Sequence, residues 1–143
     1  MDKDLHLKLT VRLYTDDNQR CFGPGIATLL HRVEEHHSLR AAAASMGMAY
    51  SKAWRIIRTA EGVFGCKLLA STILGHIFVH VLVAYCRFLK ADALPLQHGG
   101  GAVLTEQAQR LLGAYDAYCA DVQSYSQSRF EAAFGFYRDL EKE

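Results

Sequence analysis

The sequence predicts a mainly α fold with a small β-sheet, arranged as a winged helix-turn-helix with an N-terminal strand and a long C-terminal dimerisation helix. Three observations support this class. Apolar and polar residues alternate over residues 5–14, two helical stretches flank Gly47, and apolar residues at helical spacing follow Thr105. Alternation with a period of two indicates a strand with one buried face, and spacings of three and four indicate a helix.

Length and composition are those of one folded domain. The chain has 143 residues, of which 50% are hydrophobic, enough for a core with an added oligomerisation element. We expect residues 1–104 to form the winged helix-turn-helix, with residues 70–98 as an atypical hydrophobic insertion in the wing, and residues 105–143 to form a helical dimerisation region. The cysteines form no Cys-X-X-Cys pair and no signal peptide is evident, which predicts a cytoplasmic protein with reduced thiols.

The first elements are a strand and a helix. The strand is expected over residues 5–14, with a buried face formed by Leu5, Leu7, Leu9, Val11 and Leu13. A polar turn follows at residues 15–19. Pro24 then suits the first turn of a helix, which we expect to end near His36 or His37.

The next two helices form the central motif. Ser38 is the expected N-cap of an Ala-rich helix over residues 39–46, Gly47 breaks that helix, and a second helix begins near Ala49 or Tyr50. Two helices joined by a turn of three or four residues that contains Gly form the motif that lays its second helix in the DNA major groove.

The second helix separates its side chains into two arcs at about 100° per residue. The apolar arc holds Ala53, Ile56, Ile57, Ala60, Val63 and Phe64, with Trp54 at the border. The polar arc holds Ser51, Lys52, Arg55, Arg58 and Thr59. Basic residues gather around this motif although the whole chain has a net charge of only +1, a local excess that suits phosphates and guanine edges. An ordinary amphipathic helix with a solvated basic face is the alternative.

Residues 70–98 contain the most hydrophobic run of the chain, residues 77–85. Periodicity does not decide between strand and helix here. The run is shorter than the roughly 20 apolar residues of a membrane span, so an extended hairpin or a helix packed on the domain is favoured. No metal site is predicted, because no short zinc pattern fits the spacing of Cys66, His76, His80 and Cys86.

The last part of the chain predicts a wing strand and a long helix. Residues 102–104 can form the return strand of the wing, and Thr105 is the expected N-cap of the helix. Its apolar stripe holds Ala108, Leu111, Leu112, Tyr115, Tyr118, Cys119 and Val122. Residues 123–128 are a weak point, after which the stripe resumes at Phe130. A homodimer would cover this face and set two recognition helices roughly 34 Å apart; packing against residues 70–98 is the alternative.

Several stretches together carry a family resemblance. They are FGPG at residues 22–25, SLRAAA at residues 38–43, GMAYSKAWR at residues 47–55, GGGAVLT at residues 99–105, and Leu111-Leu112 with Tyr115. In combination they resemble the N-terminal DNA-binding domain of the molybdenum-responsive ModE regulator family, a winged helix-turn-helix of the LysR type, and especially short bacterial proteins consisting of that domain alone.

The resemblance implies sequence-specific binding of double-stranded DNA as a homodimer, with Tyr50, Ser51, Lys52 and Arg55 at the start of the recognition helix. From the polar arc and the local charge we expect Ser51, Lys52 and Arg55 to reach base edges, and phosphates to be contacted by Arg40, Arg58 and Lys67. The chain ends too soon for the molybdate-binding domains of the full-length regulator, so molybdate sensing is not expected. Residues 70–98 replace the family's short basic wing, as an added interaction surface or an out-of-frame coding segment.

We therefore expect a DNA-binding transcriptional regulator without molybdate-binding domains. The alternative is a dimerising protein-interaction module that has lost DNA binding through the wing insertion. An enzyme is not expected, because the sequence has no paired carboxylates, nucleophile motif or phosphate-binding loop. No cofactor, membrane or small-molecule effector is expected as a partner either.

Overall fold

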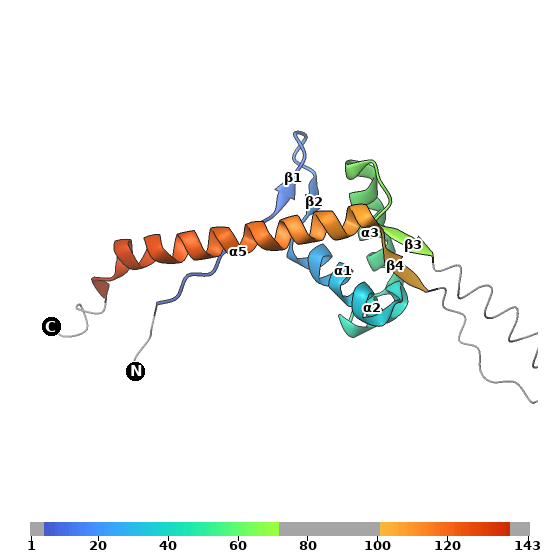
Figure 1. Cartoon of the computed structure of the whole chain (residues 1–143), viewed down its shortest axis with the longest axis horizontal. Coiled ribbons are helices and arrows are strands. Elements are labelled where there is room, and N and C mark those ends of the chain that lie inside the picture. The colour runs from blue at the N-terminus through green and yellow to red at the C-terminus, as the bar shows by residue number, and fades with distance from the viewer. Residues whose placement is uncertain (1–4, 72–100, 138–143) are drawn as a thin grey trace, which may run out of the picture.

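The computed structural model describes residues 5–71 and 101–137. In chain order, the described elements are strands β1 (Leu13–Tyr14) and β2 (Arg20–Phe22), helices α1 (Pro24–His36), α2 (Leu39–Ser45) and α3 (Tyr50–Phe64), strands β3 (Leu69–Ser71) and β4 (Ala102–Leu104), and helix α5 (Glu106–Phe134). The described part is mainly helical, with two small antiparallel strand pairs (Figure 1). This confirms the predicted class, mainly α with a small β component.

The helix ends follow local rules that the sequence already contains. The Ala41 N–H donates to the Ser38 hydroxyl at 3.3 Å, so Ser38 is the N-cap of α2. Pro24 lies in the first turn of α1, where no amide hydrogen is needed. His37 closes α1 with a left-handed backbone (φ 51°) and donates its N–H to the Val33 carbonyl. These predicted boundaries are confirmed.

The core gathers around α1. Leu29, Leu30 and Val33 are fully buried, and each such side chain contributes about 1.5–3 kcal/mol relative to exposure. The Phe22 ring of β2 meets the ring of Phe64 edge-on at 6.1 Å and that of Tyr115 at 5.0 Å. Through this aromatic cluster the N-terminal hairpin, formed by β1 and β2, packs against both α3 and α5.

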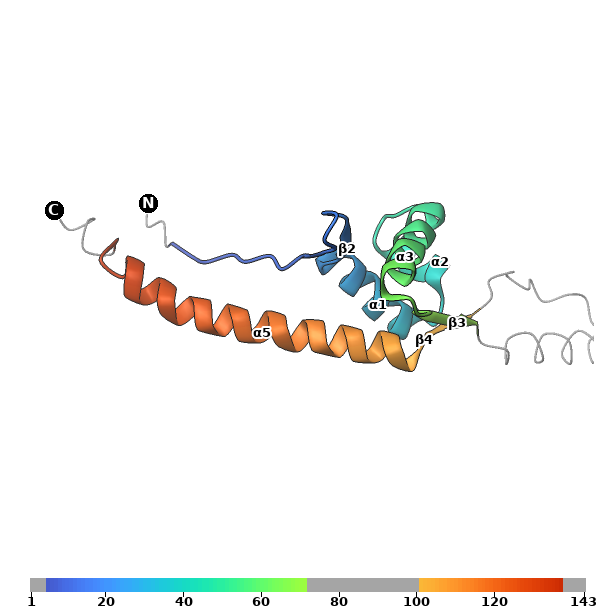
Figure 2. The same ribbon diagram turned by 90° about the horizontal axis from the view of Figure 1, so that it is seen from above.

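The predicted N-terminal strand over residues 5–14 is wrong in its extent. Only Leu13–Tyr14 is a strand, paired antiparallel with β2. Residues 5–12 form no strand pair with the described residues, and the side chains of Leu5 and Leu9 are 50% and 38% exposed. The segment runs back along α5 (Figure 2). The predicted buried face is also wrong, because Leu7, Val11 and Leu13 are only partly buried. Alternation describes the side chains, whereas a strand also requires a neighbour with which to exchange backbone hydrogen bonds.

The base of the wing is an antiparallel pair that links distant parts of the chain. Leu69 pairs with Leu104 and Ser71 with Ala102, which confirms the predicted return strand. The Ala102 N–H donates to the His37 carbonyl at 2.8 Å, so β4 is also fixed to the end of α1. The hydrophobic run over residues 77–85 lies outside the described residues.

Helix α5 is continuous through the predicted weak point at residues 123–128. Thr105 is its N-cap, as predicted, with the Ala108 N–H donating to its hydroxyl at 3.1 Å. Its buried residues, Ala108, Leu112 and Tyr115, all lie in the first third of the helix. Farther along, the helix extends away from the other helices (Figure 2). No helix within residues 5–71 or 101–137 has the length and apolar character to cross a membrane.

Candidate nucleic-acid interface

Helices α2 and α3 pack through small residues across a tight turn. Ala42 and Ala43 of α2 and Ala53 of α3 are buried, and their small side chains let the two helices approach closely. Gly47 lies in the turn with φ 61°, a left-handed conformation that glycine adopts without steric cost. The sequence therefore produces the helix-turn-helix that was predicted.

Helix α3 divides into a buried and an exposed face, as its sequence predicts. Ala53, Ile57 and Ala60 are buried, whereas Lys52 and Arg55 are exposed. The burial of the apolar face fixes the rotation of the helix about its own axis. The polar arc must then face away from the core.

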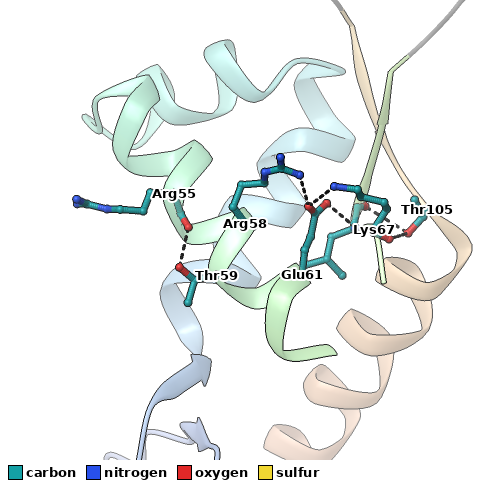
Figure 3. A network of polar contacts seen from close by, with 7 residues as sticks. Arg55, Arg58, Thr59, Glu61, Lys67 and Thr105 are labelled. Atoms are coloured by element: carbon teal, nitrogen blue, oxygen red, sulfur yellow. Dashed lines mark hydrogen bonds and ion pairs between the residues drawn. The ribbon is translucent and has the colours of Figure 1, made fainter. Parts of the chain in front are cut away.

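Three of the predicted contact residues are open to solvent on this face. The side chains of Ser51, Lys52 and Arg55 are exposed and form no hydrogen bond or ion pair with any residue in the described ranges. In Figure 3, Arg55 points away from the polar network around Glu61. Its charge is therefore available to an external anion.

Arg58 and Lys67 share a buried carboxylate. Glu61 is 9% exposed and lies 3.4 Å from the Arg58 guanidinium and 3.1 Å from the Lys67 ammonium (Figure 3). It also accepts the Leu68 N–H at 3.0 Å. Burial acts to raise the pKa of Glu61, but the Leu68 N–H and the two cations outweigh it, and the pKa lies below its ordinary value. The carboxylate thus holds both cations beside α3.

Two exposed aromatic rings position the neighbouring arginines. The Arg40 guanidinium lies 4.7 Å from the centre of the Tyr50 ring, and that of Arg58 lies 4.6 Å from the centre of the Trp54 ring. Such cation–π contacts restrict the orientation of a long side chain. These four residues line a cleft of about 490 Å³ between α3 and the base of the wing, together with Lys67.

A second groove lies on the opposite flank of α3, beside the N-terminal hairpin. It measures about 440 Å³, and its basic lining residues are Arg12, Arg20, Lys52 and Arg55. Arg12 and Arg20 were not among the predicted contact residues, because no strand was predicted at residues 20–22. A turn at residues 15–19 after a strand does indicate a returning strand such as β2. The pairing of β2 with β1 would still not have shown that the hairpin lies beside α3.

The structure thus brings the predicted residues to one side of the helix-turn-helix, in two groups. Ser51, Lys52 and Arg55 are unpaired within the described residues, whereas the other group is held by aromatic rings or by Glu61: Arg40, Tyr50, Arg58 and Lys67. Among the described residues, no three His, Cys, Asp or Glu side chains are placed to bind a metal. His76, His80 and Cys86 lie outside those residues.

The elements and this surface define a winged helix-turn-helix with a basic face on α3. No protein-family model matches the chain, and no curated protein matches it.

Proposed function

We propose that this protein is a DNA-binding transcriptional regulator of the ModE/LysR-type winged helix-turn-helix class, acting as a homodimer in the cytoplasm. One observation carries the proposal. Lys52 and Arg55 lie exposed on the face of α3 that is opposite its buried apolar face. This is the arrangement that a helix needs to enter a major groove while its back is held by the core.

Base recognition is assigned to the first turns of α3. Arg55 can contact guanine O6 and N7 through two parallel hydrogen bonds, and Lys52 can donate to the same acceptors. The Ser51 hydroxyl can donate to or accept from either type of base pair. Since all three side chains are free within the described part of the chain, binding does not require them to leave an internal partner.

Phosphate contacts are assigned to the flank beside the wing. Arg40 is oriented by Tyr50, while Arg58 and Lys67 are oriented by Glu61. Two cations beside one carboxylate keep a net positive charge, which a phosphate can neutralise. Contacts of this kind fix the register of the protein on the duplex and carry no sequence information directly.

The dimer is assigned to α5. The Tyr118 and Tyr125 side chains are 58% and 68% exposed on this helix, although both are large apolar groups. A second copy of the chain would remove them from water. A two-fold dimer would present two α3 helices to half-sites roughly 34 Å apart.

The test is selection of DNA fragments by the purified full-length protein, followed by titration of the selected fragment at several salt concentrations. We expect enrichment of a two-fold sequence and an affinity that falls steeply with salt, because phosphate contacts release counterions. Failure to retain any DNA at low salt would refute the proposal. It would favour the alternative, a dimerising protein-interaction module.

A further inference from the structure

The hairpin of β1 and β2 places two arginines beside the recognition helix. Arg20 is the first residue of β2, and the next two residues, Cys21 and Phe22, are buried. Arg12 immediately precedes β1, and its Cγ lies 3.5 Å from the position that a Cβ on Gly23 would take. Arg20 thus adjoins buried residues of β2, and Arg12 lies against Gly23, the N-cap of α1.

These arginines form one groove with the exposed cations of α3. Arg12, Arg20, Lys52 and Arg55 line the same space of about 440 Å³, and no acidic residue lines it. Asp16 and Asp17 belong to the tip of the hairpin, where the Thr15 hydroxyl donates to Asp17. The groove therefore gathers four positive charges that no lining carboxylate compensates.

The two flanks of α3 differ in this respect. Beside the wing, Arg58 and Lys67 are paired with Glu61. Beside the hairpin, none of the four cations forms an ion pair with a residue in ranges 5–71 and 101–137. Four close like charges are stabilised by an external polyanion, and the phosphate backbone of a duplex supplies regularly spaced negative charge.

We propose that the β1–β2 hairpin is a second DNA-contact element, in which Arg12 and Arg20 bind backbone phosphates on the flank of α3 opposite the wing. The inference rests on the proposed function and extends it, because the sequence placed phosphate contacts only on α2, α3 and the wing. In this arrangement Lys52 and Arg55 contact the bases, while the hairpin contacts the phosphate backbone beside them. The hairpin adds affinity that is independent of base sequence.

The experiment compares the wild-type protein with an Arg12→Gln/Arg20→Gln variant. Binding to the selected fragment and to a random duplex is measured by fluorescence anisotropy at several salt concentrations. Two lost phosphate contacts reduce the slope of log K against log salt by about 1.8 on both duplexes. The ratio of the two affinities stays that of the wild type.

Two controls keep the result interpretable. An Arg32→Gln/Arg110→Gln variant removes two cations that line neither groove, and its slope should equal that of the wild type. An Arg12→Lys/Arg20→Lys variant retains the charges and should retain most of the slope. Circular dichroism melting checks that every variant is folded.

The outcomes separate this inference from the proposed function. A wild-type slope in the Arg12→Gln/Arg20→Gln variant, with DNA binding intact, overturns the role of the hairpin and leaves the function standing. An equal loss of slope in the Arg32→Gln/Arg110→Gln variant also overturns it, since the effect would then be one of net charge. A wild-type protein that binds no DNA refutes both.

Discussion

The Glu61 carboxylate lies 3.1 Å from the Lys67 ammonium and joins the end of α3 to the segment that enters the wing. The same carboxylate accepts the Leu68 N–H at 3.0 Å, just before β3 begins. Thr105 closes this junction from the other side, because its N–H donates to the Leu68 carbonyl at 3.0 Å. Glu61 and Thr105 therefore both hold the wing strands in position relative to α3.

A Glu61→Gln variant should lose stability and gain non-specific DNA affinity. The amide cannot neutralise Arg58 and Lys67, so we expect a loss of about 1–3 kcal/mol in the free energy of unfolding. The two released cations are then free to bind phosphates. Urea denaturation and titration with a random duplex measure the two effects. The control is Glu35→Gln, which removes an exposed acid paired with Arg32 and should cost less than about 1 kcal/mol.

The pH dependence of stability should report the same carboxylate. The pKa of Glu61 is lowered in the folded protein from its ordinary value of 4.5. Its contribution is therefore fully present above pH 4.5 and is lost as the pH falls through the lowered folded pKa. Thermal melting of the wild type should become steeply pH-dependent in this acidic range. Glu61→Gln should show a smaller dependence, and an identical dependence would contradict the assignment.

Arg55→Ala and Arg58→Ala should weaken DNA binding in different ways. Loss of a base contact by Arg55 should cost about 1–3 kcal/mol on the selected site and relax the base preference there. Arg58→Ala should reduce affinity for all sequences alike, because a phosphate contact carries no sequence information. Competition between the selected and random duplexes measures the distinction. Equal binding of the selected site by wild type and Arg55→Ala would refute the assignment of Arg55.

Much of the fold could be predicted from sequence because local chemistry decides it. Ser38 and Thr105 each accept an amide hydrogen from the first turn of a helix, and Pro24 needs no partner for its nitrogen. Each of these helix ends is determined by residues that lie within four positions of one another in the chain. The extent of the N-terminal strand could not be predicted in this way. The alternation that ends at Leu13 describes side chains, whereas a strand depends on a neighbour supplied by the fold.

The candidate site likewise combines features that follow from local sequence patterns with features that depend on the tertiary fold. The exposed position of Lys52 and Arg55 follows from helical periodicity, and it was predicted. The contact of Glu61 with Lys67 depends on the reversal of the chain at Gly65, where φ is 65°. The groove formed with Arg12 and Arg20 depends on the packing of the β1–β2 hairpin, which was not predicted from the sequence. Both are tertiary relationships between residues that local patterns treat separately.

Tyr115→Phe should loosen the N-terminal segment. The Tyr115 hydroxyl donates to the Val11 carbonyl at 2.9 Å and is the side-chain link from α5 to that segment. Its loss should cost about 0.5–1.5 kcal/mol in the free energy of unfolding. Because Val11 lies two residues before β1, amide exchange should become faster in the β1–β2 pair, as measured by hydrogen–deuterium exchange. Exchange in α2 should stay unchanged, and unaltered exchange in residues 13–22 would contradict this role.

The same tyrosine predicts a loss of stability in alkali. Burial, with smaller effects of Cys119 and Asp116, raises the pKa of Tyr115 from 10.0 to about 12. Its contribution is therefore fully present below pH 10.0 and is lost as the pH rises through about 12. Tyr115→Phe should lack this part of the alkaline dependence in thermal melting. If both proteins lose stability equally above pH 10.0, the hydroxyl is not responsible.

A Tyr118→Glu/Tyr125→Glu variant should be monomeric if α5 forms the dimer. Both rings are more than half exposed, so the substitution should change the fold of one copy little while placing charges in the proposed interface. Light scattering coupled to size-exclusion chromatography measures the mass, and we expect a dimer for the wild type. Ser124→Glu is the control, because Ser124 lies on the opposite side of α5 from its buried residues. A Tyr118→Glu/Tyr125→Glu protein that remains dimeric would exclude this face as the interface, and the two half-sites would then have to be spaced by another surface.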